Sequence, residues 1–326
     1  MSLQIFTFNL MAPVFTDPDD YPATAEPFID PPYRRGKWLD LLATIKNTAD
    51  IISLQEVTDD TTEIIDGVTY FRDGEYKYIK SYLDSEFSGQ FFSHDRNYWA
   101  KYFDSNPSSS QAYTKNGNAL FLKRSRFNNP NWTDLAQSTG NHAVLGQAID
   151  NQTNKTIQIV AVHLDSDVGG NRKTELQEIL NKLSHSSNII NIVAGDFNAV
   201  LDQGNLKEVI DEANYKDVMI ELSVQTGFPL NQRTFPNSSS YYNSPVYKVI
   251  DHVIYRSNAL TPSTTLVYPG GIYTVPGQTR TGVLSNNLFL TYPELNGYDS
   301  NEGIRLTENI KLIGSDHFPV ITTFDF

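Results

Sequence analysis

Short apolar runs alternate with segments of helical periodicity along the whole chain. Eight runs are rich in Ile, Val, Phe and Thr, as β-strands are, and several of them end in a polar residue. They cover residues 4–9, 50–56, 117–123, 144–150, 156–165, 189–195, 250–256 and 318–324. Apolar residues at helical spacing predict helices near 39–46, 175–183 and 205–213. The alternation predicts an α/β protein in which hairpins make the sheets mixed.

Five long segments lack both periodicities and are expected to be irregular. They are residues 17–32, 104–116, 128–142, 234–245 and 261–301. No change of composition marks a linker and no repeat is evident, so residues 1–326 are expected to form one domain with a long insertion at about 258–311. Long loops are often functional, and this insertion is either a lid over a substrate or an ordered surface element.

Composition places the chain among ordinary globular proteins, with 39% hydrophobic and 19% charged residues. No apolar run approaches the length of about 18 residues that a membrane-spanning helix needs. The chain has no cysteine, which excludes disulfides, a thiol nucleophile and cysteine-ligated metals. Since the first residues also lack the pattern of a signal peptide, an intracellular protein is expected.

The charge balance restricts the possible partners. The chain carries 25 basic and 38 acidic side chains, a formal net charge of −13. Proteins bind nucleic acid without sequence preference by neutralising phosphates with Lys and Arg, so an acidic chain is a poor binder of that kind. It can still act on a phosphate if divalent cations supply the positive charge. The sequence points to no protein partner.

Polar residues stand where several predicted strands end. They are Asn9, Glu56, His163, Asp196 with Asn198, and Asp316 with His317. Each one taken alone has an ordinary explanation as a turn or cap residue. As a set, they offer the oxygen ligands that Mg²⁺ or Mn²⁺ prefers, together with histidines suited to proton transfer.

The sequence lacks the motifs that are typical of several other classes of enzyme. Zinc is disfavoured because the chain has only 6 histidines and none are spaced as His-x3-His. A phosphate-binding Gly-x4-Gly-Lys-Ser/Thr loop, the kinase motifs and a Gly-x-Ser-x-Gly elbow are all absent from the sequence.

Six short segments resemble, in order, the motifs of the endonuclease/exonuclease/phosphatase superfamily, the DNase I-like proteins. They are Thr-Phe-Asn-Leu at 7–10, Ile-Ser-Leu-Gln-Glu-Val at 52–57, Val-His-Leu at 162–164, Val-Ala-Gly-Asp-Phe-Asn at 193–198, Ile-Asp-His-Val-Ile-Tyr at 250–255 and Gly-Ser-Asp-His-Phe-Pro-Val at 314–320. The resemblance covers nearly the whole chain. It implies a four-layer sandwich of two mixed β-sheets flanked by helices, with the active site at one end.

The resemblance also implies a role for each matching residue. Glu56 would be the main ligand of Mg²⁺ or Mn²⁺, aided by Asn9 and Asp316. Asp196 would position or deprotonate the attacking water, and Asn198 would hold a phosphate oxygen.

The implied histidine roles complete this site. His317, oriented by Asp251, would contact the phosphate, and His163 would lie on the other side of the same phosphate. Because side chains alternate along a strand, Asp251 and His252 should point to opposite faces, and Asp251 is the one expected in the site.

The sequence resembles most the deadenylase-like branch of the superfamily. The similarity lies in Leu-Met-Ala-Pro at 10–13 and Pro-Tyr-Arg-Arg-Gly-Lys-Trp at 32–38. The tract at 163–173 departs from that branch, which usually carries basic residues there. The inositol-phosphatase signatures are missing, since position 199 is Ala and the chain lacks Cys.

Side chains outside the motifs remain open to two interpretations. Four basic residues either contact phosphate or are solvated surface charges: Arg34, Arg35, Arg172 and Lys173. Tyr241 and Tyr242 either stack on bases or pack against the protein body.

Three functions are compatible with the sequence. The first is a Mg²⁺- or Mn²⁺-dependent phosphodiesterase that hydrolyses nucleic acid, either RNA or an oligonucleotide. The second keeps the same catalytic residues but acts on a small or lipid-linked phosphoester, which the acidic net charge favours. The third is a non-catalytic scaffold of the same fold, which the intact set of polar residues disfavours.

Overall fold

The computed structural model describes most of the chain and leaves gaps in several long connections. The described residues are 1–12, 31–59, 61–65, 68–72, 74–94, 115–166, 171–201, 205–226, 249–267, 272–275, 278–281, 315, 317 and 319–326. In this part of the chain no helix is long and apolar enough to cross a membrane.

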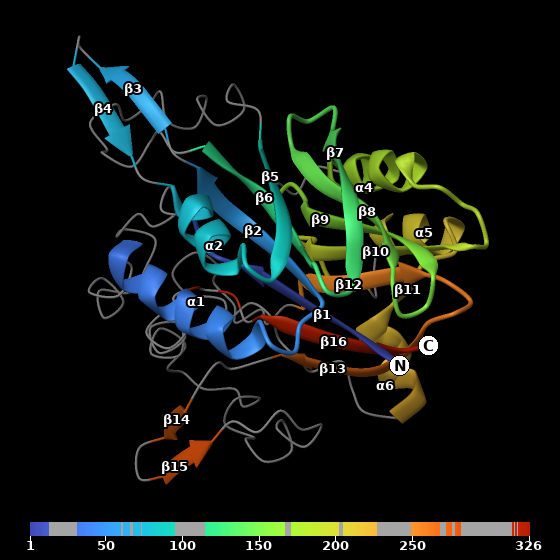
Figure 1. Ribbon diagram of the computed structural model, residues 1–326. Coiled ribbons are helices and arrows are strands. Elements are labelled where there is room, and N and C mark those ends of the chain that lie inside the picture. The colour runs from blue at the N-terminus through green and yellow to red at the C-terminus, as the bar shows by residue number, and fades with distance from the viewer. Residues whose placement is uncertain are drawn as a thin grey trace, which may run out of the picture.

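The first of two six-stranded sheets has the order β13–β16–β1–β2–β6–β5 (Figure 1). Its strands are β1 (Ser2–Asn9), β2 (Ile51–Asp59), β5 (Phe87–Ser93), β6 (Lys115–Lys123), β13 (Thr261–Val267) and β16 (Val320–Asp325). β1 and β2 are parallel, whereas the other neighbours in this sheet are antiparallel. The sheet is therefore mixed, as the sequence predicts.

The second sheet has the order β11–β12–β10–β9–β8–β7. Its strands are β7 (Phe127–Ala136), β8 (His142–Asp150), β9 (Lys155–His163), β10 (Ile189–Asp196), β11 (Lys216–Asp217) and β12 (Asp251–Arg256). Here β9 and β10 form the parallel pair. Two separate hairpins pair β3 (Thr61–Ile65) with β4 (Val68–Arg72) and β14 (Ile272–Val275) with β15 (Gln278–Thr281).

Helices cover the outer faces of the two sheets and complete a four-layer sandwich (Figure 1). α1 (Pro31–Ile45) and α2 (Glu75–Leu83) pack on the first sheet, and α4 (Asn171–Lys182) and α5 (Asn205–Glu212) pack on the second. A further helix, α6 (Val218–Thr226), follows β11. Strand alternation lets β1 serve two layers: Ile5 packs between the sheets and Phe6 packs under the helices.

A buried ion cluster joins the two sheets at the end where the chain begins and finishes. Arg126 lies between β6 and β7 and donates to both oxygens of Asp150, at 3.1 Å each, and to Asp50 Oδ2 at 2.7 Å. The chain ends meet nearby, where Phe326 N donates to Met1 O at 3.1 Å. Figure 1 shows the N- and C-termini side by side. This end of the sandwich is held by ionic contacts between strand ends.

All eight predicted strands and all three predicted helices are present. The expectation that residues 128–142 are irregular is wrong, because β7 occupies most of them. β7 is an edge strand whose side chains are mostly exposed, so it lacks the apolar alternation that reveals a strand. Residues 261–267 are also a strand, and β5 and α2 were not predicted. Most of 261–301 lies outside the described residues.

Candidate active site

Four strand segments bring the predicted polar residues to one end of the sandwich. Asn9 ends β1 in the first sheet, and Asp196 ends β10 in the second. The amide nitrogen Nδ2 of Asn9 bridges the sheets, since it donates to Asp196 Oδ2 at 3.1 Å and to Glu56 Oε1 at 2.9 Å. His163 ends β9, and its Nε2 lies 3.7 Å from Asp196 Oδ2 and 3.9 Å from Glu56 Oε1.

Glu56 is presented by a β-bulge rather than by a strand end. The pairing of β2 with β6 shifts between Leu54 and Val57, and Glu56 has a positive φ of 55°. β2 continues to Asp59, so the expectation that the strand stops at Glu56 is wrong. The extra residue leaves the regular ladder and re-aims its side chain, as bulges near active sites do. The Glu56 carboxylate therefore turns toward the end of β1.

The turn after β1 holds both first-sheet residues through backbone N–H groups. Met11 N donates to Asn9 Oδ1 at 2.9 Å, and Ala12 N donates to Glu56 Oε2 at 2.6 Å. Met11 has a φ of 60°, which is uncommon for a residue with a side chain and fixes the direction of these two N–H groups. Each of the two side chains thus has one oxygen fixed by the backbone.

Asp196 sits beside His163 because β9 and β10 approach closely at Gly195. A Cβ on Gly195 would lie 2.0 Å from Val162 O, so no side chain is possible there. Asp196 is 1% exposed, and its Oδ1 accepts from Asn198 N at 2.7 Å. Burial, together with the nearby Asp251 carboxylate, raises the pKa of Asp196 to about 7.

Asp251 and His317 form a buried pair at the same place. His317 Nδ1 lies 2.9 Å from Asp251 Oδ2, which favours the tautomer with hydrogen on Nδ1. Nε2 of His317 then faces the site, 3.6 Å from Asp196 Oδ2. The His317 backbone is held by Ser315, whose hydroxyl accepts from His317 N at 3.0 Å and donates to Asn9 O at 2.7 Å.

A further histidine at the site was not predicted. His94 directly follows β5, and its ring centroid lies 6.0 Å from that of His163. Its Nδ1 accepts from His142 N at 3.0 Å. Burial lowers the pKa of His94 well below its usual range and also lowers the pKa of His163, for which the Glu56 carboxylate is an opposing influence. The run Phe-Phe-Ser-His at 91–94 carries the same signal as the other strand ends.

The Asn198 side chain bonds to the backbone just after β9. Asn198 lies in the turn after β10 with a φ of 50°, and its Nδ2 donates to Leu164 O at 2.8 Å. One of its amide hydrogens is thus used to join two loops of the second sheet, and Arg172 donates to the Asn198 carbonyl. Asp316 lies outside the described residues.

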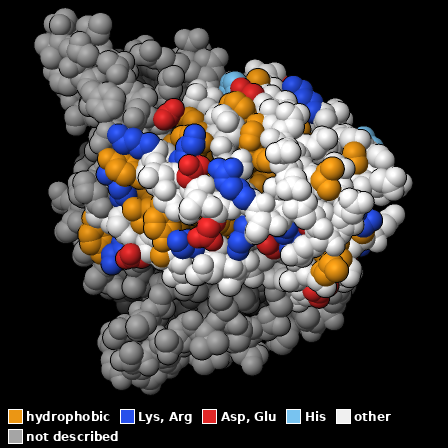
Figure 2. Space-filling model, viewed as in Figure 1, with side chains coloured by type: hydrophobic (Ala, Val, Ile, Leu, Met, Phe, Trp, Pro, Cys, Tyr) orange, Lys and Arg blue, Asp and Glu red, His pale blue; other side chains and the backbone are white. Residues whose placement is uncertain are grey.

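The basic residues outside the motifs behave differently from one another. Arg34 is fully buried and donates to Leu10 O at 3.0 Å and to Met11 O, so both earlier interpretations of it are wrong. The Arg35 guanidinium lies over the Tyr78 ring at 3.9 Å. Lys173 is an exposed side chain 3.3 Å from Glu208. Figure 2 shows basic and acidic side chains interspersed on the face it presents. Tyr241 and Tyr242 lie outside the described residues.

His252 points to the other face of β12, as the alternation predicts. Its Nδ1 lies 3.0 Å from Asp217 Oδ2, and its Nε2 lies 3.1 Å from Ala199 O and 3.0 Å from Val249 O. It has no part in the cluster around Asp196.

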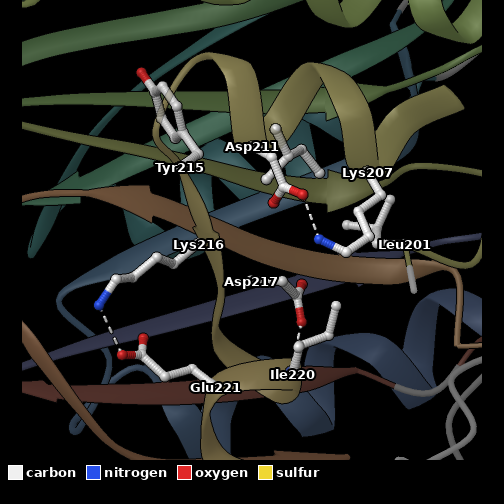
Figure 3. A pocket seen from close by; sticks show the side chains of 9 residues that line it. Leu201, Lys207, Asp211, Tyr215, Lys216, Asp217, Ile220 and Glu221 are labelled. Atoms are coloured by element: carbon white, nitrogen blue, oxygen red, sulfur yellow. Dashed lines mark hydrogen bonds and ion pairs between the residues drawn. The ribbon is translucent and has the colours of Figure 1, made fainter. Parts of the chain in front are cut away.

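A cavity of about 380 Å³ lies beside Asp217, lined mainly by residues of α5, β11 and α6. Figure 3 shows two ion pairs among its charged side chains, Lys207 with Asp211 and Lys216 with Glu221, and the fifth, Asp217, pairs with His252. Because these charges are already neutralised, this cavity is a weaker candidate site than the strand-end cluster.

The donor set at the strand ends suits a divalent cation. One ligand atom each from Asp196, Asp251 and His317 lie within 4.8 Å of one another, and all three side chains are buried. Glu56 adds a carboxylate that shares the Asn9 amide with Asp196. Buried carboxylates this close repel one another, and a bound cation would offset that repulsion.

Comparison with known proteins agrees with this geometry. The sequence profile of the Endonuclease/Exonuclease/phosphatase family matches residues 8–317, and the chain belongs to this family. Its members are hydrolases that act on phosphoester bonds and in general depend on divalent metals. No curated protein sequence matches the chain.

Solved structures share the fold at low sequence identity. The human Nocturnin catalytic domain with bound sulfate has a TM-score of 0.61 and 16% identity, over 100% of this chain and 93% of that one. D. rerio TDP2 in complex with a single-strand DNA product has a TM-score of 0.53 and 16% identity, over 100% and 99%. The Bacteroides thetaiotaomicron mannosyl-6-phosphatase Bt3783 has a TM-score of 0.56 and 15% identity, over 99% and 100%. These likenesses confirm the DNase I-like sandwich.

Proposed function

We propose that the chain is a phosphodiesterase that depends on Mg²⁺ or Mn²⁺ and hydrolyses nucleic acid, either RNA or an oligonucleotide. The observation that carries the proposal is the convergence of Asn9, Glu56, His163, Asp196 and His317 at one end of the sandwich. These residues come from five separate segments, and the protein brings two carboxylates and two imidazoles together with little exposure to water. Such an arrangement costs free energy that a bound ligand can offset.

Glu56 and Asn9 would hold the cation, with Asp316 as a third ligand, while the buried group of Asp196, Asp251 and His317 would act beside it on the water and the phosphate. When bound, such a cation offsets the negative charge that grows on the phosphate oxygens during hydrolysis. The Glu56 carboxylate is suited to this role because the Ala12 N–H fixes Oε2 while Oε1 faces the cluster.

Asp196 would accept the proton of the attacking water. The water oxygen bonds to phosphorus, the bond from phosphorus to the leaving oxygen breaks, and the leaving oxygen takes a proton from solvent. The pKa of Asp196, raised to about 7 by burial and by the Asp251 charge, makes this carboxylate a stronger base than an ordinary Asp.

His317 and His163 would flank the phosphate. Asp251 orients the His317 ring and stabilises its charged form, which can then donate from Nε2 to a phosphate oxygen. His163 lies across Asp196 from this pair and would contact the same phosphate from the other side.

Two observations bear on the substrate. The motif style resembles the deadenylase-like branch, and one neighbour of the same fold is TDP2 bound to a single-strand DNA product. The second candidate is a small or lipid-linked phosphoester. It is favoured by the net charge of −13 and by the likeness to a mannosyl-6-phosphatase.

A substrate panel tests the proposal. It contains RNA and DNA oligonucleotides, a sugar phosphate, a lipid-linked phosphodiester and a chromogenic diester, each with Mg²⁺, Mn²⁺ or chelator. We expect metal-dependent cleavage of oligonucleotides by wild type. In Glu56→Gln and in Asp196→Asn the rate should fall on the order of 10²–10³-fold. Faster hydrolysis of the sugar phosphate would select the second candidate. Failure on every substrate would favour the scaffold, and full activity of both variants would refute the site.

A further inference from the structure

Arg34 lies beneath the turn that holds Asn9 and Glu56. It is the fourth residue of α1, is fully buried, and its Nη1 donates to Leu10 O at 3.0 Å and to Met11 O. A buried guanidinium is costly unless its hydrogens find acceptors. Arg34 also interacts electrostatically with the buried carboxyl of Glu75. Burial raises the pKa of Glu75, and the positive charge of Arg34 offsets part of that increase.

The two carbonyls that Arg34 binds belong to the two peptide groups that bind the site. Leu10 O and Met11 N are the ends of one peptide group, and this N–H donates to Asn9 Oδ1 at 2.9 Å. Met11 O and Ala12 N are the ends of the next, and this N–H donates to Glu56 Oε2 at 2.6 Å. One guanidinium group therefore orients both donors.

This geometry has an electrostatic consequence. A cation at a carbonyl oxygen polarises the peptide group and makes its N–H a stronger donor, so hydrogen bonds in a chain reinforce one another. The turn also contains Met11 at a φ of 60°, a conformation that surrounding contacts must hold. Leu10 N donates to Gln55 O at 2.9 Å, which ties the turn to the bulge that presents Glu56.

We propose that Arg34 is a positioning residue, which acts through the peptide groups at 10–12 to fix Asn9 and Glu56 for a divalent cation. Arg34 itself contacts neither substrate nor cation. Its effect on the cation rests on the proposed function, since it needs Glu56 to be a ligand. Residues that support metal ligands in this way typically change metal affinity by about 10- to 100-fold when replaced.

A matched pair of variants separates positioning from ordinary fold stabilisation. Arg34→Lys keeps the positive charge but loses the guanidinium contacts to both carbonyls. Arg126→Lys makes the same change in a second buried arginine, which binds Asp50 and Asp150 at the other end of the sandwich. Both variants are expected to lower the melting temperature.

The first measurement is Mn²⁺ binding to the purified full chain, followed by the electron paramagnetic resonance signal of free Mn²⁺. Arg34→Lys is expected to raise the dissociation constant about tenfold, and Arg126→Lys is expected to leave it at the wild-type value. Equal dissociation constants in all three proteins would overturn the proposal.

The second measurement needs no cation and keeps the two proposals distinct. Amide hydrogen exchange, measured by NMR without metal, should become faster at Met11 and Ala12 in Arg34→Lys, relative to the strand amides, and not in Arg126→Lys. If wild type binds no Mn²⁺ and Arg34→Lys still shows the faster exchange, the metal role of Glu56 is refuted. The positioning of the turn by Arg34 is then still supported. Unchanged exchange at both amides would overturn the positioning role.

Discussion

Asp251 and His252 are neighbours in β12, yet each belongs to a different buried Asp–His pair. On one face of the strand, Asp251 Oδ2 lies 2.9 Å from His317 Nδ1. On the other face, Asp217 Oδ2 lies 3.0 Å from His252 Nδ1. The two pairs have the same composition, similar burial and nearly the same length.

They differ at the second ring nitrogen. Nε2 of His252 faces two backbone carbonyls, so both of its nitrogens are placed to donate hydrogen, which favours the charged ring; the Asp217 carboxylate raises its pKa in the same direction. Nε2 of His317 faces two side chains of the cluster instead, the Asp196 carboxylate at 3.6 Å and the Asn9 amide at 3.4 Å. The two Asp–His pairs therefore differ in what surrounds the far nitrogen: backbone carbonyls tie His252 into the fold, whereas side chains of the carboxylate cluster face His317.

The largest expected difference between the pairs is in catalysis. Replacing His317 with Gln or Asp251 with Asn should lower phosphodiesterase activity on the order of 10³-fold, because an oriented imidazole is lost. Asp217→Asn and His252→Gln should stay within a few-fold of wild type. Steady-state rates with a saturating oligonucleotide and Mn²⁺ test this, and equal losses in both pairs would end the distinction.

Stability should show the opposite order. Asp217→Asn leaves the buried His252 cation without its counter-charge, and we expect it to lower the free energy of unfolding by about 3 kcal/mol. Asp251→Asn removes a charge that repels Asp196, so its cost should be below about 1 kcal/mol. Urea unfolding of both variants without metal measures the two values. A larger loss in Asp251→Asn would contradict the assignment of roles.

Cation binding should separate the two faces as well. Mn²⁺ at a hundredfold excess over its dissociation constant should add about 2.7 kcal/mol to the free energy of unfolding of wild type. His252→Gln should gain the same increment and Glu56→Gln almost none. Melting curves with Mn²⁺ or chelator provide the measurement, and an undiminished increment in Glu56→Gln would exclude Glu56 as a ligand.

The smallest expected effect is a pH dependence of stability that comes from the Asp217–His252 pair. Burial alone would lower the pKa of His252, but the Asp217 carboxylate and the Val249 carbonyl outweigh it and the pKa is raised. A raised pKa stabilises the fold fully below the unfolded value, near 6.5, and this stabilisation is lost as pH rises through the folded value. The stability of wild type relative to His252→Gln should therefore decline above pH 6.5, by at most about 1.4 kcal/mol per pH unit. A flat difference would show that His252 is neutral.

The sequence was sufficient for the parts of the molecule with strong local signals. Apolar runs predicted the central strands, because these are buried on both faces. Residues that follow such runs, Asn9, His163 and Asp196, were found for the same reason, since the ends of parallel strands meet at one edge. Strand alternation was enough to separate Asp251 from His252.

Features that depend on contacts between distant segments were not predictable. The bulge at Glu56 is a mismatch between two strands, so the sequence of β2 alone does not reveal it. Arg34 looks like a surface charge in sequence, and only the fold shows it buried under the β1 turn. The exposed edge strand β7 has no apolar period to detect.

The meeting of the two chain ends has a practical consequence for experiments on this protein. Ser2 pairs with Asp325, whereas Asn9 lies at the opposite end of the same strand, roughly 23 Å away at about 3.3 Å per residue. A tether or fluorophore attached at either end would hold the protein with the carboxylate cluster facing away from the support. Immobilised or single-molecule assays can therefore be built on either terminus without crowding the carboxylate cluster.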